Sequence, residues 1–207
     1  MSNRYVYGVV ANEDAIELET EAVRGASEIY PISHRGLAAL VSDVETTDPE
    51  RTDEDARRHD DVLRSIMEHN GKRAVVPMRF GMVFENDRAL KNVLRGGRPA
   101  FRRTLREVEG RVELGLKIVR EEDATVDREA VAGAIEDELE SIAVDSVENR
   151  LFSDRLVVNR SYLVPDDERE AFSEAISRLE ESYDELAFRY TGPFAPYSFV
   201  DIQIGAQ

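Results

Sequence analysis

The chain contains no cysteine, which excludes disulfide bonds, thiolate nucleophiles and cysteine-based metal sites. It also lacks any run of 18 apolar residues, so a membrane-spanning helix is not expected. Residues 1–15 have neither the apolar core nor the small-residue cleavage site of a signal peptide. These three absences together favour a cytoplasmic protein.

Lysine is scarce: Lys72, Lys91 and Lys117 are the only lysines among 27 basic residues. The 43 acidic residues outnumber the bases and give a formal net charge of −16. Such a surface repels nucleic-acid phosphates and anionic lipid, so neither a nucleic acid nor a membrane is expected as a partner. A composition with many acidic residues and few lysines is typical of proteins that stay soluble in concentrated salt. At 1 M salt the Debye length is about 3 Å, so repulsion between the acidic residues of the chain is screened. The composition favours a halophilic source, with an ordinary acidic mesophile protein as the alternative.

Strand-like and helix-like segments alternate along the 207 residues, of which 42% are apolar. That content is enough for a core in one domain or two small ones. Helix starts are predicted at polar capping residues, namely Thr52, Asn86, Asp127 and a capping box at Asp167 and Glu170. Strands are predicted from apolar and β-branched runs at residues 4–11, 28–33, 37–44, 112–118, 156–164, 186–190 and 200–204.

The order of these segments predicts an α+β fold of two small mixed α/β domains. A helix ends and a strand begins near Gly110, so we expect an N-terminal α+β domain over residues 1–110. Residues 111–207 read as strand–helix–strand, then helix–strand, with an extra terminal strand. That order is typical of a ferredoxin-like domain.

Catalytic motifs are missing from the sequence. His59 and His69 are ten residues apart, which is not the spacing of a helical zinc pair, and no metal role is expected. His59 falls on the apolar stripe of its helix and is interpreted as a packed or hydrogen-bonded residue. No nucleophile elbow, phosphate-binding loop or dinucleotide fingerprint is present. We therefore expect neither an enzyme nor a bound cofactor.

Two segments are unusual in composition. Residues 75–84 (VVPMRFGMVF) contain a single charge, Arg79, which is either buried with an acidic partner or exposed at an edge or interface. Residues 190–200 (YTGPFAPYSFV) contain four aromatic residues and two prolines. This second segment is either a domain-closing loop packed on the core or a recognition surface of rigid aromatic side chains.

These segments also carry a family likeness. Five motifs in order resemble the gas vesicle GvpF/GvpL family over essentially the whole chain: YVYGVV, LAALVSDV, VVPMRFGMVF, RLVVNRSYLVP and YTGPFAPYSFVD. His59 falls where the family usually has a histidine, ahead of a P-x-R-F-G block. Phe194 stands where the family more often has tryptophan, which is a conservative departure. Composition and length make the chain most like a haloarchaeal GvpF.

The resemblance implies two α/β domains, the C-terminal one ferredoxin-like, and a function without catalysis. Family members bind the hydrophobic shell protein GvpA and other accessory Gvp proteins, and are thought to prevent shell-protein aggregation before assembly. A partner with an apolar aromatic patch can cover such a shell protein, while its acidic exterior keeps the complex soluble. The candidate contact residues, chosen by motif and chemistry, are Arg79, Phe80, Phe194, Tyr197 and Phe199.

Two other functions stay open at this point. One is a hydrolase built on His59, Asp60 and Arg79, which a cavity holding these three side chains together would favour. The other is a ligand-sensing ferredoxin-like regulatory module, which a deep pocket between the two halves would favour.

Overall fold

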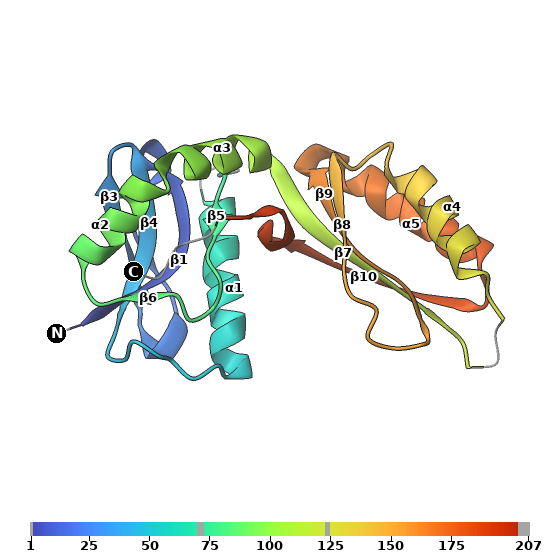
Figure 1. Ribbon diagram of the computed structural model, residues 1–207, viewed down its shortest axis with the longest axis horizontal. Coiled ribbons are helices and arrows are strands. Elements are labelled where there is room, and N and C mark those ends of the chain that lie inside the picture. The colour runs from blue at the N-terminus through green and yellow to red at the C-terminus, as the bar shows by residue number, and fades with distance from the viewer. Residues whose placement is uncertain (1, 70–72, 123–124, 203–207) are drawn as a thin grey trace. The chain divides into compact units, whose positions relative to one another are not determined.

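A computed structural model describes residues 2–69, 73–122 and 125–202 (Figure 1). Its contacts divide the chain into two compact units. The N-terminal unit comprises residues 1–110 and 195–207, and the C-terminal unit comprises residues 111–194. Within the described residues, no helix is both long enough and apolar enough to cross a bilayer.

The N-terminal unit is built on an antiparallel sheet with β1 (Asn3–Ala11) in its middle. The strand order is β2 (Leu18–Glu19), β3 (Glu28–His34), β4 (Leu37–Val44), β1 and β5 (Val76–Pro77), and the short β6 (Val83–Phe84) also pairs with β1. The apolar run of β1 predicted a central strand buried on both faces, and this is confirmed. Tyr5, Val6 and Tyr7 have no exposed surface.

Helices cover both faces of this sheet, so the unit has two hydrophobic cores. Val62, Leu63 and Ile66 of one helix pack with Tyr5 and Tyr7 in the first core. Buried leucines and a phenylalanine of two consecutive helices form the second core with Val6 and Val9: Leu90, Leu94, Phe101 and Leu105. The helices are α1 (Asp53–Glu68), α2 (Asp87–Gly96) and α3 (Arg98–Val108). The predicted caps are present, because Thr52 Oγ1 accepts from Asp55 N–H and Asn86 Oδ1 accepts from Ala89 N–H.

The C-terminal unit has the element order β-α-β-β-α-β of a ferredoxin-like fold. Its elements are β7 (Arg111–Arg120), α4 (Arg128–Leu139), β8 (Asp145–Glu148), β9 (Leu156–Pro165), α5 (Arg169–Ser182) and β10 (Leu186–Phe194). The antiparallel sheet has the order β10-β7-β9-β8. Strand β8 was missed from the sequence because it has four residues, of which only Val147 is apolar. With β8 in place, the α+β class and the ferredoxin-like second half are confirmed.

Three sequence-based details of the C-terminal half are wrong. The capping box at Asp167 and Glu170 does not form, because residues Asp166–Glu168 make a 3₁₀ turn and α5 begins at Arg169 without a side-chain cap. The Gly192–Pro193 dipeptide predicts a turn after the strand at residues 186–190, but it lies inside β10, where the pairing with β7 shifts. The expected terminal strand is not formed by residues 200–202, and the rest of it, residues 203 and 204, lies outside the described residues.

Residues 195–202, which we call the C-terminal segment, contact the N-terminal unit rather than the C-terminal one. Assigning residues 195–207 to the second domain is therefore wrong for the described part of that range. The physical reason is apolar packing. Ala195 and Tyr197 join the core that α1 covers, and Val200 and Ile202 pack on the core that α2 and α3 cover.

Candidate functional site

The block around Arg79 folds as a tight turn between β5 and β6. The N–H of Met82 donates to the carbonyl of Arg79 at 3.3 Å, and Gly81 occupies the third position with φ of +87°. A type II turn needs a positive φ at that position, which glycine adopts without strain. The Phe80–Gly81 pair therefore determines where the chain reverses. We call residues 79–82 the RFG turn.

Both ends of the RFG turn are attached to β1 by backbone hydrogen bonds. Met78 N–H donates to the Tyr7 carbonyl at 2.8 Å, and Val6 N–H donates to the Met82 carbonyl at 2.9 Å. Inside the turn, Gly81 N–H donates to the Tyr5 hydroxyl oxygen at 3.3 Å. The turn is thus held by the central strand of the sheet and not by its own residues alone.

His59 of α1 connects the helix to the same turn. Its ring is 2% exposed, and Nε2 lies 3.0 Å from the Met78 carbonyl oxygen. Because a carbonyl only accepts, Nε2 carries the proton, and Nδ1 accepts from the Tyr5 hydroxyl at 2.8 Å. Burial lowers the pKa of His59 and outweighs the opposing effect of the bond to Met78. The ring is therefore neutral, and the expectation of a packed, hydrogen-bonded histidine is confirmed.

Aromatic rings surround His59. Tyr7 stacks on it with ring centroids 5.4 Å apart, Phe80 meets it edge-on at 6.0 Å, and Tyr197 stacks at 6.3 Å. These separations fall in the range of about 4.5–7 Å in which aromatic pairs attract. On Phe80, the guanidinium carbon of Arg51 lies 5.8 Å from the ring centroid. We call Tyr5, Tyr7, His59, Phe80 and Tyr197 the aromatic cluster.

Tyr197 brings the C-terminal segment into this cluster. It belongs to a 3₁₀ turn, Tyr197–Phe199, and its hydroxyl donates to Asp60 Oδ1 at 3.0 Å. Ala195 beside it is buried. The packing interpretation of residues 190–200 therefore accounts for Tyr197, whose ring is half-buried against α1.

The five candidate contact residues come from both units. Arg79 is exposed at the RFG turn and makes no ion pair with any described residue. The alternative in which Arg79 is buried with an acidic partner is therefore wrong. Phe80, Tyr197 and Phe199 are half-buried in the N-terminal unit. Phe194 is 37% exposed and ends β10 of the C-terminal unit.

The three residues of the hydrolase alternative make different contacts in the structure and do not form one catalytic group. Both ring nitrogens of His59 are hydrogen-bonded within the core, Asp60 accepts from Tyr197, and Arg79 is exposed. Such an arrangement leaves His59 no free nitrogen for proton transfer. Among the described residues there is also no group of three His, Cys, Asp or Glu side chains placed to hold a metal ion.

Sequence reasoning missed the residues that position the RFG turn. Tyr5 lies in an apolar strand 54 positions from His59, and nothing in the local pattern pairs them. The one signal was the placement of His59 on an otherwise apolar helical stripe, which indicates a buried partner without naming it.

Comparison with known proteins identifies the class to which this architecture belongs. The family model described as gas vesicle synthesis protein GvpL/GvpF matches residues 3–128 and 119–201. The chain belongs to this family, and the resemblance seen in the sequence motifs is confirmed. Membership supports a role in gas vesicle assembly.

Individual relatives are similar over nearly the full length. Gas vesicle protein F of Haloferax mediterranei is 53% identical, and gas vesicle protein F1 of Halobacterium salinarum is 50% identical; each match covers 99% of this chain and 96% of the relative. These haloarchaeal relatives agree with the halophilic composition. The crystal structure of GvpF from Anabaena sp. PCC7120 covers 98% of this chain with a TM-score of 0.84 at 20% identity. That of GvpF from Microcystis aeruginosa covers 97% with a TM-score of 0.83 at 16% identity, and both show the same fold.

Proposed function

We propose that this protein binds the hydrophobic gas vesicle shell protein GvpA and other accessory Gvp proteins, and keeps the shell protein from aggregating during vesicle assembly. It acts in the cytoplasm in association with the gas vesicle, by binding and without catalysis. The candidate contacts are Arg79, Phe80, Tyr197 and Phe199 of the N-terminal unit and Phe194 of the C-terminal unit.

The observation that carries this proposal is the RFG turn. It presents an exposed Arg79 beside a half-exposed Phe80, a pairing of residue types that is enriched in protein interfaces. Backbone bonds to β1 and the bonds of Tyr5 and His59 already hold the turn in one conformation. A rigid contact site loses little conformational entropy on binding, which strengthens association.

The acidic composition supports the second half of the proposal. A strongly apolar partner self-associates through exposed hydrophobic surface and strand edges. A bound chain with a net charge of −16 adds like charge to each complex, which opposes close contact between complexes at the short distances that concentrated salt does not screen. This effect requires only that the apolar contact be small relative to the acidic surface.

The test is co-purification of tagged protein with the shell protein in concentrated salt. Arg79→Ala is the decisive variant because Arg79 is exposed and has no ion pair with any described residue, so its loss leaves folding intact. Arg79→Ala combined with Phe80→Ala is expected to weaken binding by about tenfold or more, as loss of a central interface contact does. Phe194→Ser and Phe199→Ser test the remaining contacts one at a time.

Phe152→Ser is the matched control, since Phe152 is the most exposed large apolar side chain among the described residues, at 70%, and is not a candidate contact. It should bind like the unmodified protein. Full binding by folded Arg79→Ala and Arg79→Ala/Phe80→Ala proteins, judged by circular dichroism, would exclude the RFG turn as the contact site.

A further inference from the structure

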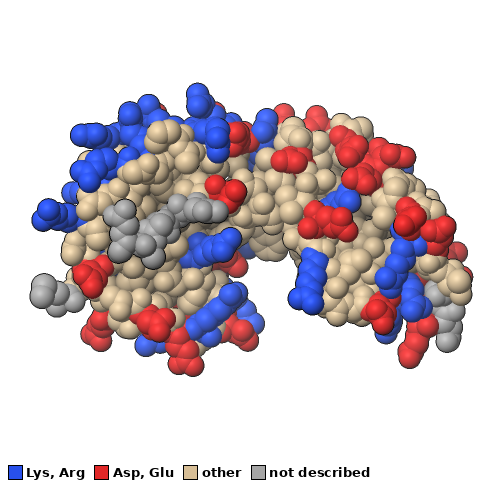
Figure 2. Space-filling model, viewed as in Figure 1, with Lys and Arg blue, Asp and Glu red and all other residues tan. Residues whose placement is uncertain are grey.

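Residues 88–106 carry seven basic side chains and no acidic one, in a chain whose net charge is −16. They span α2 and α3, the helices that cover one face of the N-terminal sheet (Figure 1). Basic side chains gather over these helices in the space-filling view (Figure 2). We call the seven the basic face: Arg88, Lys91, Arg95, Arg98, Arg102, Arg103 and Arg106.

The cations of the basic face form few direct ion pairs with the described residues, although Arg102 and Arg106 share a pocket with Glu13, Asp14 and Glu109. Among the described residues, only Arg103 has a carboxylate partner, Glu107, at 3.7 Å and exposed to solvent. Arg98 donates to the Arg35 carbonyl and Arg106 to the Arg102 carbonyl, so these side chains keep their full charge. Five of the seven are exposed, and Lys91 and Arg98 are half-exposed.

The positive charge extends to the β3–β4 turn next to these helices. Burial lowers the pKa of His34, and the cations Arg35, Arg95, Lys91 and Arg98 lower it further. Four cations acting on one imidazole, without a carboxylate to offset them, indicate a concentrated positive potential over this side of the unit. A chain with 43 acidic residues therefore keeps a local surface that attracts carboxylates.

Acidic residues flank the basic face in the sequence at both ends. Asp87 precedes it, and Glu107 and Glu109 follow it. Its two helical segments, residues 88–96 and 98–106, are each about 14 Å long at 1.5 Å per residue and are separated at Gly97. An extended polyanion would run past these limits onto acidic surface and be repelled, whereas a compact acidic surface of similar size fits. This argument favours a folded acidic partner over a nucleic acid.

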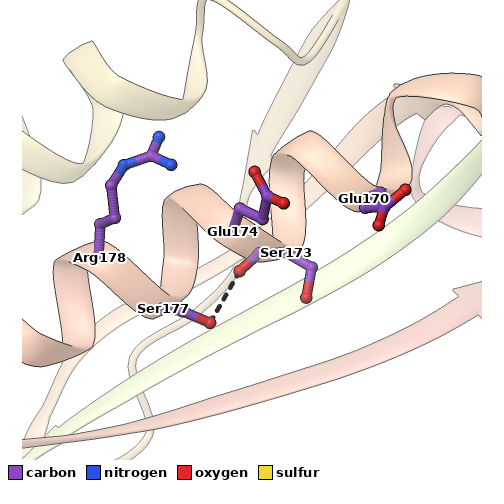
Figure 3. Close-up of a pocket in the computed structure, with 5 residues that line it drawn as sticks. All are labelled: Glu170, Ser173, Glu174, Ser177 and Arg178. Carbon is purple, nitrogen blue, oxygen red and sulfur yellow. Dashed lines mark hydrogen bonds between the residues drawn. The ribbon is translucent and has the colours of Figure 1, made fainter.

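The complementary charge is present in the same chain. The C-terminal unit contains 22 acidic and 10 basic residues, a net charge of −12, against 21 acidic and 17 basic residues and −4 for the N-terminal unit. A shallow hollow of about 510 Å³ lies on α5 of the C-terminal unit, lined by Glu170, Ser173, Glu174, Ser177 and Arg178 (Figure 3).

The two carboxylates of that hollow are not paired with a cation of any described residue. Glu170 and Glu174 are exposed at i and i+4 of α5, a like-charge spacing that is mildly unfavourable in a helix. Neither has an ion pair with a described residue, and the one arginine of the hollow, Arg178, binds Glu138 at 2.9 Å instead. Guanidinium groups of another molecule would form ion pairs with both carboxylates, since the two N–H donors of an arginine match the geometry of a carboxylate.

We propose that the basic face of one molecule docks on the acidic α5 surface of a second copy, with Arg95 and Arg102 among the cations and Glu170 and Glu174 among the anions. The contact is head-to-tail, so any oligomer keeps a free basic face at one end and a free acidic surface at the other, and short linear oligomers can form. Direct ion pairs of about 3 Å are no longer than the Debye length of about 3 Å at 1 M salt, so they are screened less than interactions between more distant charges. The residues are separate from the RFG turn, so this inference stands apart from the shell-protein proposal.

The test is sedimentation velocity over a concentration series in about 1 M KCl, with circular dichroism to confirm folding. The unmodified protein should show an average mass that rises with concentration. Arg95→Glu/Arg102→Glu and Glu170→Lys/Glu174→Lys should each weaken self-association by about tenfold or more, because like charges then oppose each other. A mixture of the two variants should associate again, because the reversed basic face of one meets the reversed acidic surface of the other.

Arg57→Glu/Arg64→Glu is the matched control, since it changes the net charge equally at exposed positions of α1, outside the basic face. It should associate like the unmodified protein. A monomer at every concentration, an equal loss in the control, or no recovery in the mixture would each overturn the proposal. Binding of a glutamate peptide or an oligonucleotide by a strictly monomeric protein would assign the basic face to another partner instead.

Discussion

The two units bury tyrosine in different ways. In the N-terminal unit the Tyr5 hydroxyl bonds His59 and Gly81, and the Tyr7 hydroxyl lies 2.9 Å from Ser42 Oγ and accepts from Val23 N–H at 3.1 Å. In the C-terminal unit Tyr162 packs against Phe172, and its buried hydroxyl has no hydrogen-bond partner among the described residues. The Tyr5 hydroxyl thus helps to hold a surface turn in place, whereas Tyr162 contributes through the packing of its ring.

The pKa values of the buried tyrosines Tyr7 and Tyr162 do not differ between the two units. Burial raises the pKa of Tyr7 to about 12, against the opposing effect of its bonds to Ser42 and Val23. Burial also raises the pKa of Tyr162 to about 12, with the neighbouring charge of Arg160 acting against it. Both phenols are neutral at physiological pH, so the contrast between the units lies in hydrogen bonding and not in charge.

Tyr5→Phe should give the largest effect on stability. The change removes one donor and one acceptor and leaves His59 Nδ1 and Gly81 N–H without their partner in or near the core. A lost buried partner costs about 1–3 kcal/mol in free energy of unfolding. Urea denaturation in concentrated KCl measures it. A cost no greater than that of Tyr162→Phe would remove the distinction between the two cores.

A smaller effect is expected from pH. The folded-state pKa of His59 lies below its ordinary value near 6.5, so the unfolded chain takes up a proton first as pH falls. The stabilisation is complete above about pH 6.5 and is lost as pH falls from there through the folded-state pKa. Denaturation at pH 7.5, 6.5 and 5.5 should show this loss for the unmodified protein, with His34 adding a contribution of the same sign.

His59→Gln is the matched control for the pH series, because an amide side chain can still donate to Met78 and accept from Tyr5 without titrating. Its stability should depend less on pH between 7.5 and 5.5. An unchanged slope would show that His59 does not contribute to the pH dependence.

Tyr162→Phe should give the smallest effect. By distance and angle the hydroxyl makes no hydrogen bond with a described residue that the change would remove, so the free energy of unfolding should shift by less than about 0.5 kcal/mol. The same urea series measures it. A loss above about 1 kcal/mol would show that the C-terminal core also depends on a polar contact.

Local chemistry made much of the fold predictable. Thr52, Asn86 and Asp127 begin helices where predicted, because a cap needs only the few residues that follow it. The capping box at Asp167 failed because a competing 3₁₀ turn formed in the same residues. Strand β8 could not be predicted from the sequence, because it is its pairing with β9, and not its own composition, that makes it a strand.

The candidate site was predictable only in part. The RFG turn was identified as a segment, since Gly81 and the single charge of Arg79 are visible in the sequence. Whether Arg79 is buried or exposed could not be decided, because that depends on which neighbouring segments cover it. The net charge of the chain does not reveal the basic face, because it sums this local cluster of cations with the acidic residues elsewhere in the chain.

The sequence by itself determined the family, the halophilic composition, the α+β class and most helix starts, because motifs, composition and caps act over short stretches of chain. The three-dimensional fold was needed to show that Tyr5 and His59 meet, that the C-terminal segment packs on the N-terminal unit and that Phe194 belongs to the C-terminal unit while Tyr197 belongs to the N-terminal one. These facts depend on contacts between residues 54 to more than 130 positions apart. Such contacts are set by the packing of whole elements, and no local pattern contains that information.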